Sequence, residues 1–108
     1  MSADYEHVEV TNNAAKRRYE IHVDHHIAVL EYERAGQQIA FVHAGVPPAL
    51  EGHGLASKLA RTALDDARAA HLSVLAACPF VATYVRRHRE YLDLLPAAEQ
   101  TRVLQDEH

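Results

Sequence analysis

Two glycines flank a histidine in the stretch "PALEGHGLASKLA", residues 48–60, directly before a helix-like run. Gly52 and Gly54 are two of only four glycines in the chain, and glycine has an entropic cost where a helix begins. A helix N-terminus leaves amide N–H groups unpaired and favours anions, so glycines there let a phosphate approach the backbone. The stretch has neither a P-loop nor a Gly-x-Gly-x-x-Gly pattern. On the local pattern alone, a plain turn into the helix is the stronger interpretation.

Cys78 is the only cysteine, and it stands between a short apolar run and a helical pattern. A thiol at a helix N-terminus is favoured as the thiolate, the form that attacks a carbonyl. Cys78 is therefore a candidate nucleophile, and a buried structural cysteine is the alternative. The stretch "HVDHH", residues 22–26, lacks the paired ligand motifs of a metal site. We expect surface histidines there and no bound metal.

Strand patterns occupy the first half of the chain. The stretch "RRYEIHVDH", residues 17–25, alternates apolar and polar positions, and "HIAVLEYER", residues 26–34, is rich in strand formers. A turn around Gly36 leads to "IAFVHAGV", residues 39–46. Because short turns join the three stretches, we predict an antiparallel meander.

Helical periodicity follows the glycine loop. Apolar residues recur at every fourth position from Leu55 to Ala67, which predicts an amphipathic helix over residues 54–70. The run "LSVLAA", residues 72–77, is too short for a helix and indicates a buried strand. The order strand, helix, strand is a β-α-β unit with a parallel strand pair. A ligand site is expected at the carboxyl ends of such strands, where the glycine loop lies.

A second helical pattern begins after Pro79 and ends before Pro96. It places Phe80, Tyr84, His88 and Leu92 on one face. We expect core positions for Phe80, Tyr91 and Leu95, and solvated or capping positions for Glu90 and Asp93. Beyond Pro96 the polar tail is either a short helix or disordered.

Composition limits the class of protein. The chain of 108 residues is 48% hydrophobic and 24% charged, which is typical of one globular domain over 1–108, with a core at about 17–95. A net charge of −4 argues against a nucleic-acid partner. No apolar run approaches the roughly 20 residues of a membrane span. The chain has one cysteine, and its first ten residues lack the basic and apolar regions of a secretory leader, so we expect a cytoplasmic protein. A monomer is compatible with the sequence, which leaves the oligomeric state open.

Two dense motifs show a family resemblance. They are "FVHAGVPPALEGHGLASKL", residues 41–59, and "LAACPFVATYVRRHREYLDLL", residues 75–95. Together they closely resemble the small, single-domain branch of the GNAT (GCN5-related) N-acetyltransferases. The resemblance implies an α/β (α+β) fold, with a mostly antiparallel sheet, one parallel β-α-β pair and two main helices.

The resemblance also implies acetyl-coenzyme A (acetyl-CoA) as cofactor, with its pyrophosphate held by backbone N–H groups of the loop 51–56. Glu51 stands where the family usually has Gln or Arg, so a positive charge is missing, and Lys58 or Arg61 are candidates to offset this loss. The implied cofactor-binding residues are Phe41, Ala44, Val46, Glu51, Gly52, His53, Gly54, Leu55, Ala56, Lys58, Cys78, Tyr84 and His88.

Three residues are implied to act in acetyl transfer. An amine with a pKa near ~10.4 must lose a proton before it attacks, and His43 is the candidate general base. A strand histidine without function is the alternative. Cys78 is the candidate for an acetyl-enzyme route, although direct transfer to the amine is the more usual GNAT chemistry. Tyr84 is the candidate acid for the leaving thiolate, with core packing as its alternative.

The predicted function is N-acetyltransfer to a primary amine. The short chain favours an open groove for an exposed lysine or N-terminus of a protein or peptide over an enclosed small-molecule pocket. The rival interpretation is a non-catalytic module that binds acyl-coenzyme A. Glu51, and Ala44 where threonine is common in this branch, are the departures that support it.

Overall fold

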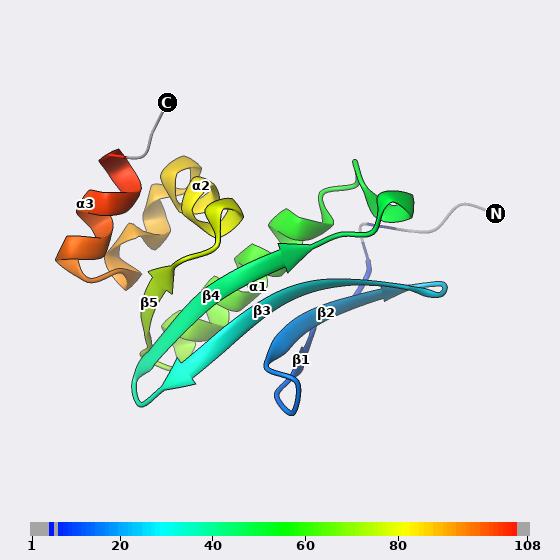
Figure 1. Ribbon diagram of the computed structural model, residues 1–108, viewed down its shortest axis with the longest axis horizontal. Helices are drawn as coiled ribbons and strands as arrows, with labels where there is room; N and C mark the ends of the chain where they lie inside the picture. Colours follow the sequence, from blue (N-terminus) through cyan, green and yellow to red (C-terminus); the bar gives the residue numbers. More distant parts are fainter. Residues whose placement is uncertain (1–4, 6, 106–108) are drawn as a thin grey trace.

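Five strands in the order β1-β2-β3-β4-β5 form one sheet in the computed structural model, which describes residues 5 and 7–105 (Figure 1). The strands are β1 (Thr11–Asn13), β2 (Arg18–Val23), β3 (His26–Ala35), β4 (Gln38–Gly45) and β5 (Ser73–Ala76). The α-helices are α1 (Leu55–Ala69), α2 (Pro79–Arg87) and α3 (Ala97–Gln105), and the 3-10 turns are η1 (Pro48–Leu50) and η2 (Arg89–Leu94).

All neighbouring strands are antiparallel except β4 and β5, which α1 joins as a parallel pair. This arrangement confirms the predicted meander followed by a β-α-β unit. The strand β1 was not predicted, because its residues "TNN" have no apolar alternation. Its place depends on pairing with β2, where Asn12 lies opposite Tyr19. The tail beyond Pro96 was predicted to be either a short helix or disordered. It forms a helix, α3.

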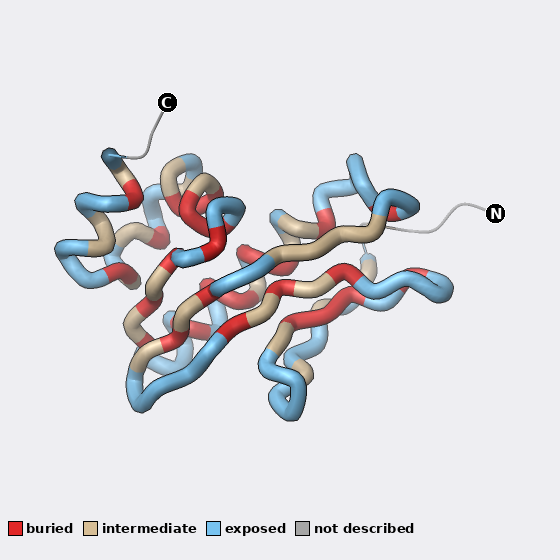
Figure 2. The backbone as a smooth tube through the Cα atoms, viewed as in Figure 1, coloured by how far each residue is buried: buried red, intermediate tan, exposed pale blue. Residues whose placement is uncertain are grey.

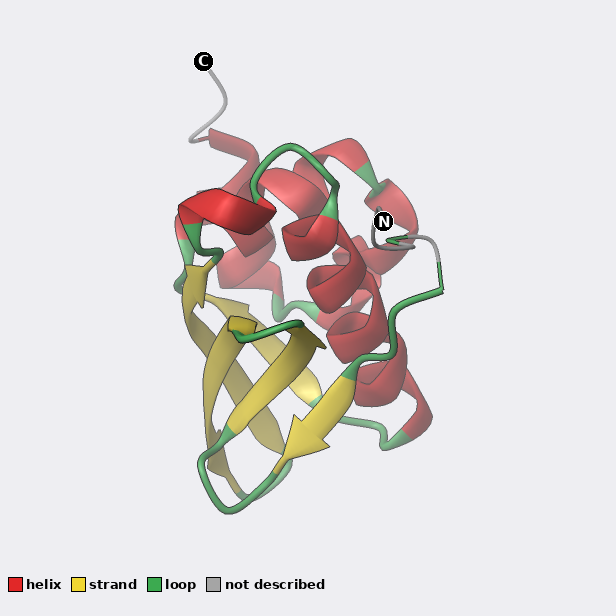
Figure 3. Ribbon diagram, turned by 90° about the vertical axis from the view of Figure 1, so that its right-hand side faces the viewer, coloured by secondary structure: helices red, strands yellow, loops and turns green. Residues whose placement is uncertain are grey.

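The core lies between the sheet and the helices, which gather on one side of it (Figures 2 and 3). The alternating residues Tyr19, Ile21 and Val23 of β2 all face this core. The stripe of α1 is buried as predicted, with Leu55, Leu59, Ala60, Ala63, Leu64 and Ala67 inside. The other face of β2–β4 has no helix over it (Figure 1). No helix within the described residues is both long and apolar enough to cross a membrane.

The second predicted helix is interrupted, so its predicted extent was wrong. It ends at His88, whose backbone angles (φ −130°, ψ 74°) leave the helical region, and η2 follows. Side chains satisfy the last carbonyl groups of α2, since His88 Nδ1 lies 3.0 Å from the Tyr84 carbonyl and Arg89 Nε donates to that of Arg86. Tyr91 and Leu95 are buried as expected.

Phe80 departs from its predicted core position. Its side chain is 37% exposed, although its type and helical spacing indicated burial. Phe80 is the second residue of α2, next to the point where the chain leaves β5. There it lines a surface groove, which explains why an aromatic ring remains open to solvent.

Candidate functional site

A bulge in β4 releases this strand from β5. The two strands pair only as far as Phe41 and Ala76, and the Cys78 amide then donates to the Phe41 carbonyl at 2.7 Å. At the same point the register with β3 shifts, so that Val42 is an extra residue between two paired positions. A bulge bends and twists its strand. Residues 43–45, which we call the released stretch, therefore keep β3 on one side but have no strand pairing on the β5 side among the described residues.

A groove of about 220 Å³ opens at Val46, directly after the released stretch, and the glycine loop forms part of its lining. It is lined by Val46, Leu50, Glu51, Gly52, Gly54, Leu55, Ala56, Ser57 and Phe80. Most of these residues are among those that the sequence predicted for cofactor binding. The groove is largely apolar, apart from Glu51, Ser57 and the backbone at the start of α1.

The sequence left two explanations for the glycine loop, a tight turn into the helix and a surface that a phosphate can approach. The structure is compatible with both. Gly52 and Gly54 have φ of 85° and 73°, a left-handed conformation that side chains disfavour, so the turn itself requires glycine. A Cβ added at either position would meet no atom within 4 Å, so the space outside the loop is open. Gly54 is also the N-cap of α1, and no side chain caps this helix end. The amide groups of the first turn of α1 thus border an open surface.

A second, larger pocket of about 480 Å³ lies between the beginning of α1 and α2. Its lining residues are Tyr5, His53, Gly54, Ser57, Lys58, Arg61, Tyr84 and His88. Gly54 and Ser57 belong to both cavities, so the first turn of α1 separates them. The two candidate cations, Lys58 and Arg61, face this larger pocket rather than the groove.

Two stacked pairs of rings form the walls of the larger pocket. The Tyr5 and His53 rings lie 3.8 Å apart and are parallel within 2°. The Tyr84 and His88 rings lie 4.0 Å apart, at 16°. Burial raises the pKa of Tyr84, so its hydroxyl keeps its proton at neutral pH. Tyr5 was missed by sequence analysis, because it stands far from both motifs and only the folded chain brings it to the loop.

His43 lies on the released stretch and faces away from the core. Its neighbours Phe41 and Ala44 pack inward, whereas the His43 side chain is exposed on the open face of the sheet. A Cβ at Gly45 would lie 3.2 Å from His43 Nε2, so the absence of a side chain there makes room for the imidazole. Sequence analysis did not single out Gly45, although a glycine two residues after the candidate base was a signal that it could have used.

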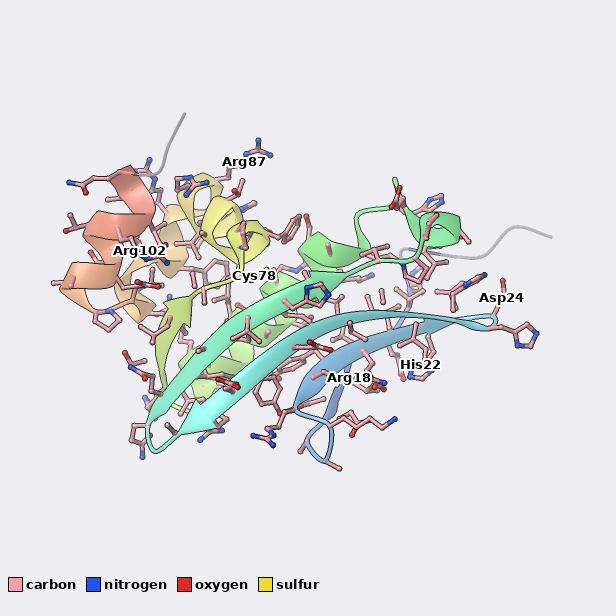
Figure 4. All side chains as sticks on the ribbon, viewed as in Figure 1. Arg18, His22, Asp24, Cys78, Arg87 and Arg102 are labelled. Atoms are coloured by element: carbon pink, nitrogen blue, oxygen red, sulfur yellow. The ribbon has the colours of Figure 1, made fainter. Side chains whose placement is uncertain are left out.

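Cys78 is buried, with 3% of its surface exposed, and it forms the N-cap of α2. Figure 4 shows Cys78 at the junction of β5 and α2, next to β4. Its backbone N–H donates a hydrogen bond to the carbonyl of Phe41, which holds Cys78 next to the bulge and opposite a residue two positions before His43. The structure therefore brings the two candidates for chemistry to the same end of the sheet. The Phe41 side chain itself lies in the core.

The histidine-rich stretch has a structural role. His22 Nε2 lies 2.9 Å from the carboxylate of Glu20, and Arg18 and Asn13 donate to the same carboxylate. Hydrogen bonds from His22 and then Arg18 lower the pKa of Glu20 to about 2, against the opposing effect of burial. Figure 4 shows Arg18 and His22 along β2. Within residues 5 and 7–105, no group of three or more His, Cys, Asp or Glu side chains is arranged to hold a metal ion.

Comparison with known proteins identifies relatives over most of the chain. A profile of the family described as GCN5-related N-acetyl-transferase matches residues 18–94. Protein NATD1 from Homo sapiens is 31% identical over 93 residues, which cover 82% of each chain, and NATD1 from Gallus gallus is equally similar over 84% of its length. The NMR structure of a GCN5-like protein from Staphylococcus aureus superimposes with a TM-score of 0.66 at 24% identity, covering 82% of this chain and 88% of that one. This last likeness concerns the fold alone.

Proposed function

The chain belongs to the GCN5-related N-acetyltransferase family, and from this premise we propose that it transfers an acetyl group from acetyl-CoA to a primary amine. The observation that supports this function best is the released stretch of β4, which contains His43, begins opposite the Cys78 amide and leads into Val46, a residue of the groove that the glycine loop also lines. The acceptor that we propose is an exposed lysine or N-terminus of a protein or peptide.

The residues of the groove fit the cofactor. The arm of coenzyme A contains amide groups, and the unpaired edge of the released stretch offers backbone partners of the kind that a strand would use. The open surface at Gly52 and Gly54, with the uncapped start of α1, suits the pyrophosphate. The Glu51 carboxylate opposes a phosphate, whereas Lys58 and Arg61, one to two turns further along α1, favour it. When bound, the cofactor supplies an acetyl group activated as a thioester.

His43 acts in this proposal as the general base that takes a proton from the incoming amine. Its side chain is exposed on the face of the sheet that no helix covers, so a lysine of another protein can reach it. Backbone N–H groups of the strand 41–46 are the proposed donors to the developing oxyanion. The part of Tyr84 in protonating the leaving thiolate stays a prediction, since Tyr84 lines the larger pocket and not the groove.

Direct transfer is the route that we propose, because the Cys78 thiol is buried. In the alternative route the thiol takes the acetyl group first and then passes it to the amine. Incubation of the protein with acetyl-CoA alone, followed by mass spectrometry, distinguishes the two routes. We expect no acetyl adduct on Cys78 and retained turnover in Cys78→Ser. An adduct that disappears when amine is added would establish the acetyl-enzyme route.

The test of the function itself has two parts. Calorimetry measures binding of coenzyme A and acetyl-CoA, and a panel of lysine peptides, N-terminal peptides, free amino acids and polyamines then measures turnover. We expect binding together with acetylation of the peptides. Turnover with free polyamines or amino acids alone would contradict the proposed acceptor.

A non-catalytic acyl-coenzyme A module is the second candidate. It is favoured by the Glu51 carboxylate, which lies in the groove where the family usually has Gln or Arg. Binding without turnover on every amine would support this module, and absence of binding would contradict both functions.

A further inference from the structure

A polar pocket of about 280 Å³, which we call the open-face pocket, lies on the face of β2–β4 that no helix covers (Figure 1). Glu31 and Glu33 flank Tyr32 in β3, and because Tyr32 is buried in the core, the two carboxylates lie on the opposite, open face. Val42, the extra residue of the bulge, adds an exposed apolar side chain. The lining residues are Lys16, Arg17, Glu31, Tyr32, Glu33 and Val42, none of which lines the groove or the larger pocket.

Strand register places this pocket next to the candidate base. Glu31 of β3 lies directly opposite His43 of β4, and Val42 immediately precedes His43 in the chain. Directly opposite residues of an antiparallel pair share one face of the sheet, with Cβ atoms about 5 Å apart. An amine that reaches His43 therefore arrives beside Glu31, and the chain that carries this amine can extend over the open-face pocket.

Four charged side chains of both signs line the pocket. Glu31 and Glu33 come from β3, whereas Lys16 and Arg17 come from the turn that leads into β2. Within the described part of the chain, none of the four side chains forms a hydrogen bond or an ion pair, with one another or with a further residue. The pocket thus presents two carboxylates and two cations that are available for charges of opposite sign on a ligand.

The two signs follow an order across the sheet. The carboxylates stand on β3, one strand away from His43, and the cationic turn lies on the far side of β3, where the Arg17 carbonyl accepts from the Tyr32 amide at 3.0 Å. Neighbouring strands are about 4.8 Å apart, and side chains on one side of an extended peptide recur about every 6.6 Å. A peptide that crosses the strands from His43 therefore brings its second residue from the target over the carboxylates and its fourth to the cations. A run of basic residues would instead place like charges beside that turn.

We propose that the open-face pocket docks the acceptor, and that it selects a peptide with a basic residue at the second position from the target lysine and an acidic residue at the fourth. Glu31 and Glu33 pair with the basic residue, and Lys16 and Arg17 pair with the acidic one. The inference rests on the proposed function, because it specifies the sequence around the acceptor lysine of that reaction. The four residues determine specificity and do not touch the reacting atoms.

A panel of lysine peptides tests the proposed preference. Matching peptides carry Arg two positions and Glu four positions from the lysine, on its N-terminal or its C-terminal side. Reference peptides have Ala at both positions, and reversed peptides exchange Arg and Glu. We measure kcat/KM with acetyl-CoA, and peptide affinity by fluorescence anisotropy. One matching peptide should exceed its Ala reference about tenfold in kcat/KM, the effect of two exposed ion pairs, and this preference should decrease at high salt.

Charge substitutions identify the residues responsible. Glu33→Gln, and Glu31→Gln with Glu33→Gln, should lower the ratio of kcat/KM between the matching and the Ala peptide, about threefold and fivefold respectively. Glu33→Arg should shift the preference toward the reversed peptide, whose Glu then meets a cation. Glu90→Gln removes the same charge from an exposed position on η2 and should keep the wild-type ratio. Because a ratio is compared, any general effect of Glu31 on His43 cancels, and thermal melts of each variant check that the fold is intact.

The outcomes separate this inference from the function on which it rests. If the wild type acetylates all the peptides equally well, the function stands and the docking inference is overturned. A preference that persists in the Glu31 and Glu33 variants would also overturn it, because recognition would then lie elsewhere. If no peptide is acetylated, but the matching peptide binds most tightly and the variants lose this difference, the function fails and the docking site stands. Absence of both acetylation and selective binding would contradict both.

Discussion

Two neighbouring stretches of sheet edge in this protein lack a partner strand. One has its backbone covered by side chains, and the other is open. The edge of β5 is closed by side chains of α3. Glu99 Oε2 accepts from the Ala76 amide at 2.8 Å, and Arg102 Nη2 donates to the Ala76 carbonyl at 2.8 Å. Glu99 and Arg102 are also paired with each other, so together they replace one residue of a sixth strand. Unpaired strand edges invite association with other chains, and here the backbone groups of Ala76 are already occupied.

The released stretch of β4 has no such cover. The bulge at Val42 turns residues 43–45 away from β5, and no described side chain is hydrogen-bonded to the exposed edge in the way that Glu99 and Arg102 cover Ala76. The comparison teaches that this end of the sheet has two kinds of edge: Ala76 of β5 is covered by side chains, whereas the stretch next to the glycine loop and the buried Cys78 keeps its backbone open.

Phe41→Ala should produce the largest loss of stability. Phe41 is fully buried at the last position where β4 and β5 pair, so truncation leaves a cavity between the sheet and the helices. We expect a decrease of about 3–5 kcal/mol in the free energy of unfolding, measured by urea denaturation. A decrease below about 1 kcal/mol would show that β4 does not depend on this anchor.

His43→Ala should have the converse effect, with a large loss of turnover and little loss of stability. Removal of a general base lowers the rate by about 100-fold or more. Because the side chain is exposed, the free energy of unfolding should change by no more than about 0.5 kcal/mol. Acetyl-CoA affinity should be unchanged, and His26→Ala is the matched control. Turnover within about threefold of the wild type would remove His43 from the mechanism.

Sequence analysis predicted the regular elements well and the irregular ones poorly. Periodicity located β2 and α1, because each buries one face against the core, and a short apolar run located β5. It could not find the bulge, since neither glycine nor proline marks Val42 and the extra residue is visible only in the register with β3. The end of α2 at His88 was also missed, because no glycine or proline marks it. Side chains satisfy the last carbonyl groups of the helix instead.

In the candidate site, too, the parts formed by local sequence were predicted and the parts formed by tertiary contacts were not. The two motifs contain the glycine loop, His43 and Cys78, so the groove was predictable from local sequence and resemblance. The aromatic wall of the larger pocket was not, because Tyr5 reaches His53 only through the tertiary fold. Phe80 was misjudged because helical spacing cannot tell a core position from the rim of a groove.

Glu99→Ala should uncover the β5 edge without affecting the chemistry. It leaves the buried Ala76 amide unsatisfied and Arg102 without its carboxylate, which should cost about 2 kcal/mol of stability in denaturation experiments. Light scattering should detect increased self-association, because a free edge then faces solvent. Glu99→Gln retains an acceptor for the amide, so its stability and its state of association should be close to those of the wild type. Unchanged stability and a monodisperse solution would show that α3 does not protect this edge.

The smallest effect is expected from a cluster of charged and polar side chains around Glu20 on β2. Glu20 on β2 has its pKa lowered to about 2 from 4.5, because it accepts hydrogen bonds from His22 and Arg18. A carboxyl with a lowered pKa stabilises the fold above its unfolded pKa, and this contribution is lost as pH falls from about 4.5 toward 2. We expect a contribution of about 1 kcal/mol, since His22 is largely exposed and solvent screens the pair.

Urea denaturation at a series of pH values measures this contribution. Glu20→Gln should be less stable than the wild type at pH 7, and the difference should decrease as pH falls through this range. His22→Ala should remove part of the same pH dependence, because it deletes the main cause of the lowered pKa. A constant difference between wild type and Glu20→Gln across the range would mean that Glu20 acts through packing. The contribution of Glu20 would then come from its packing and not from its charge.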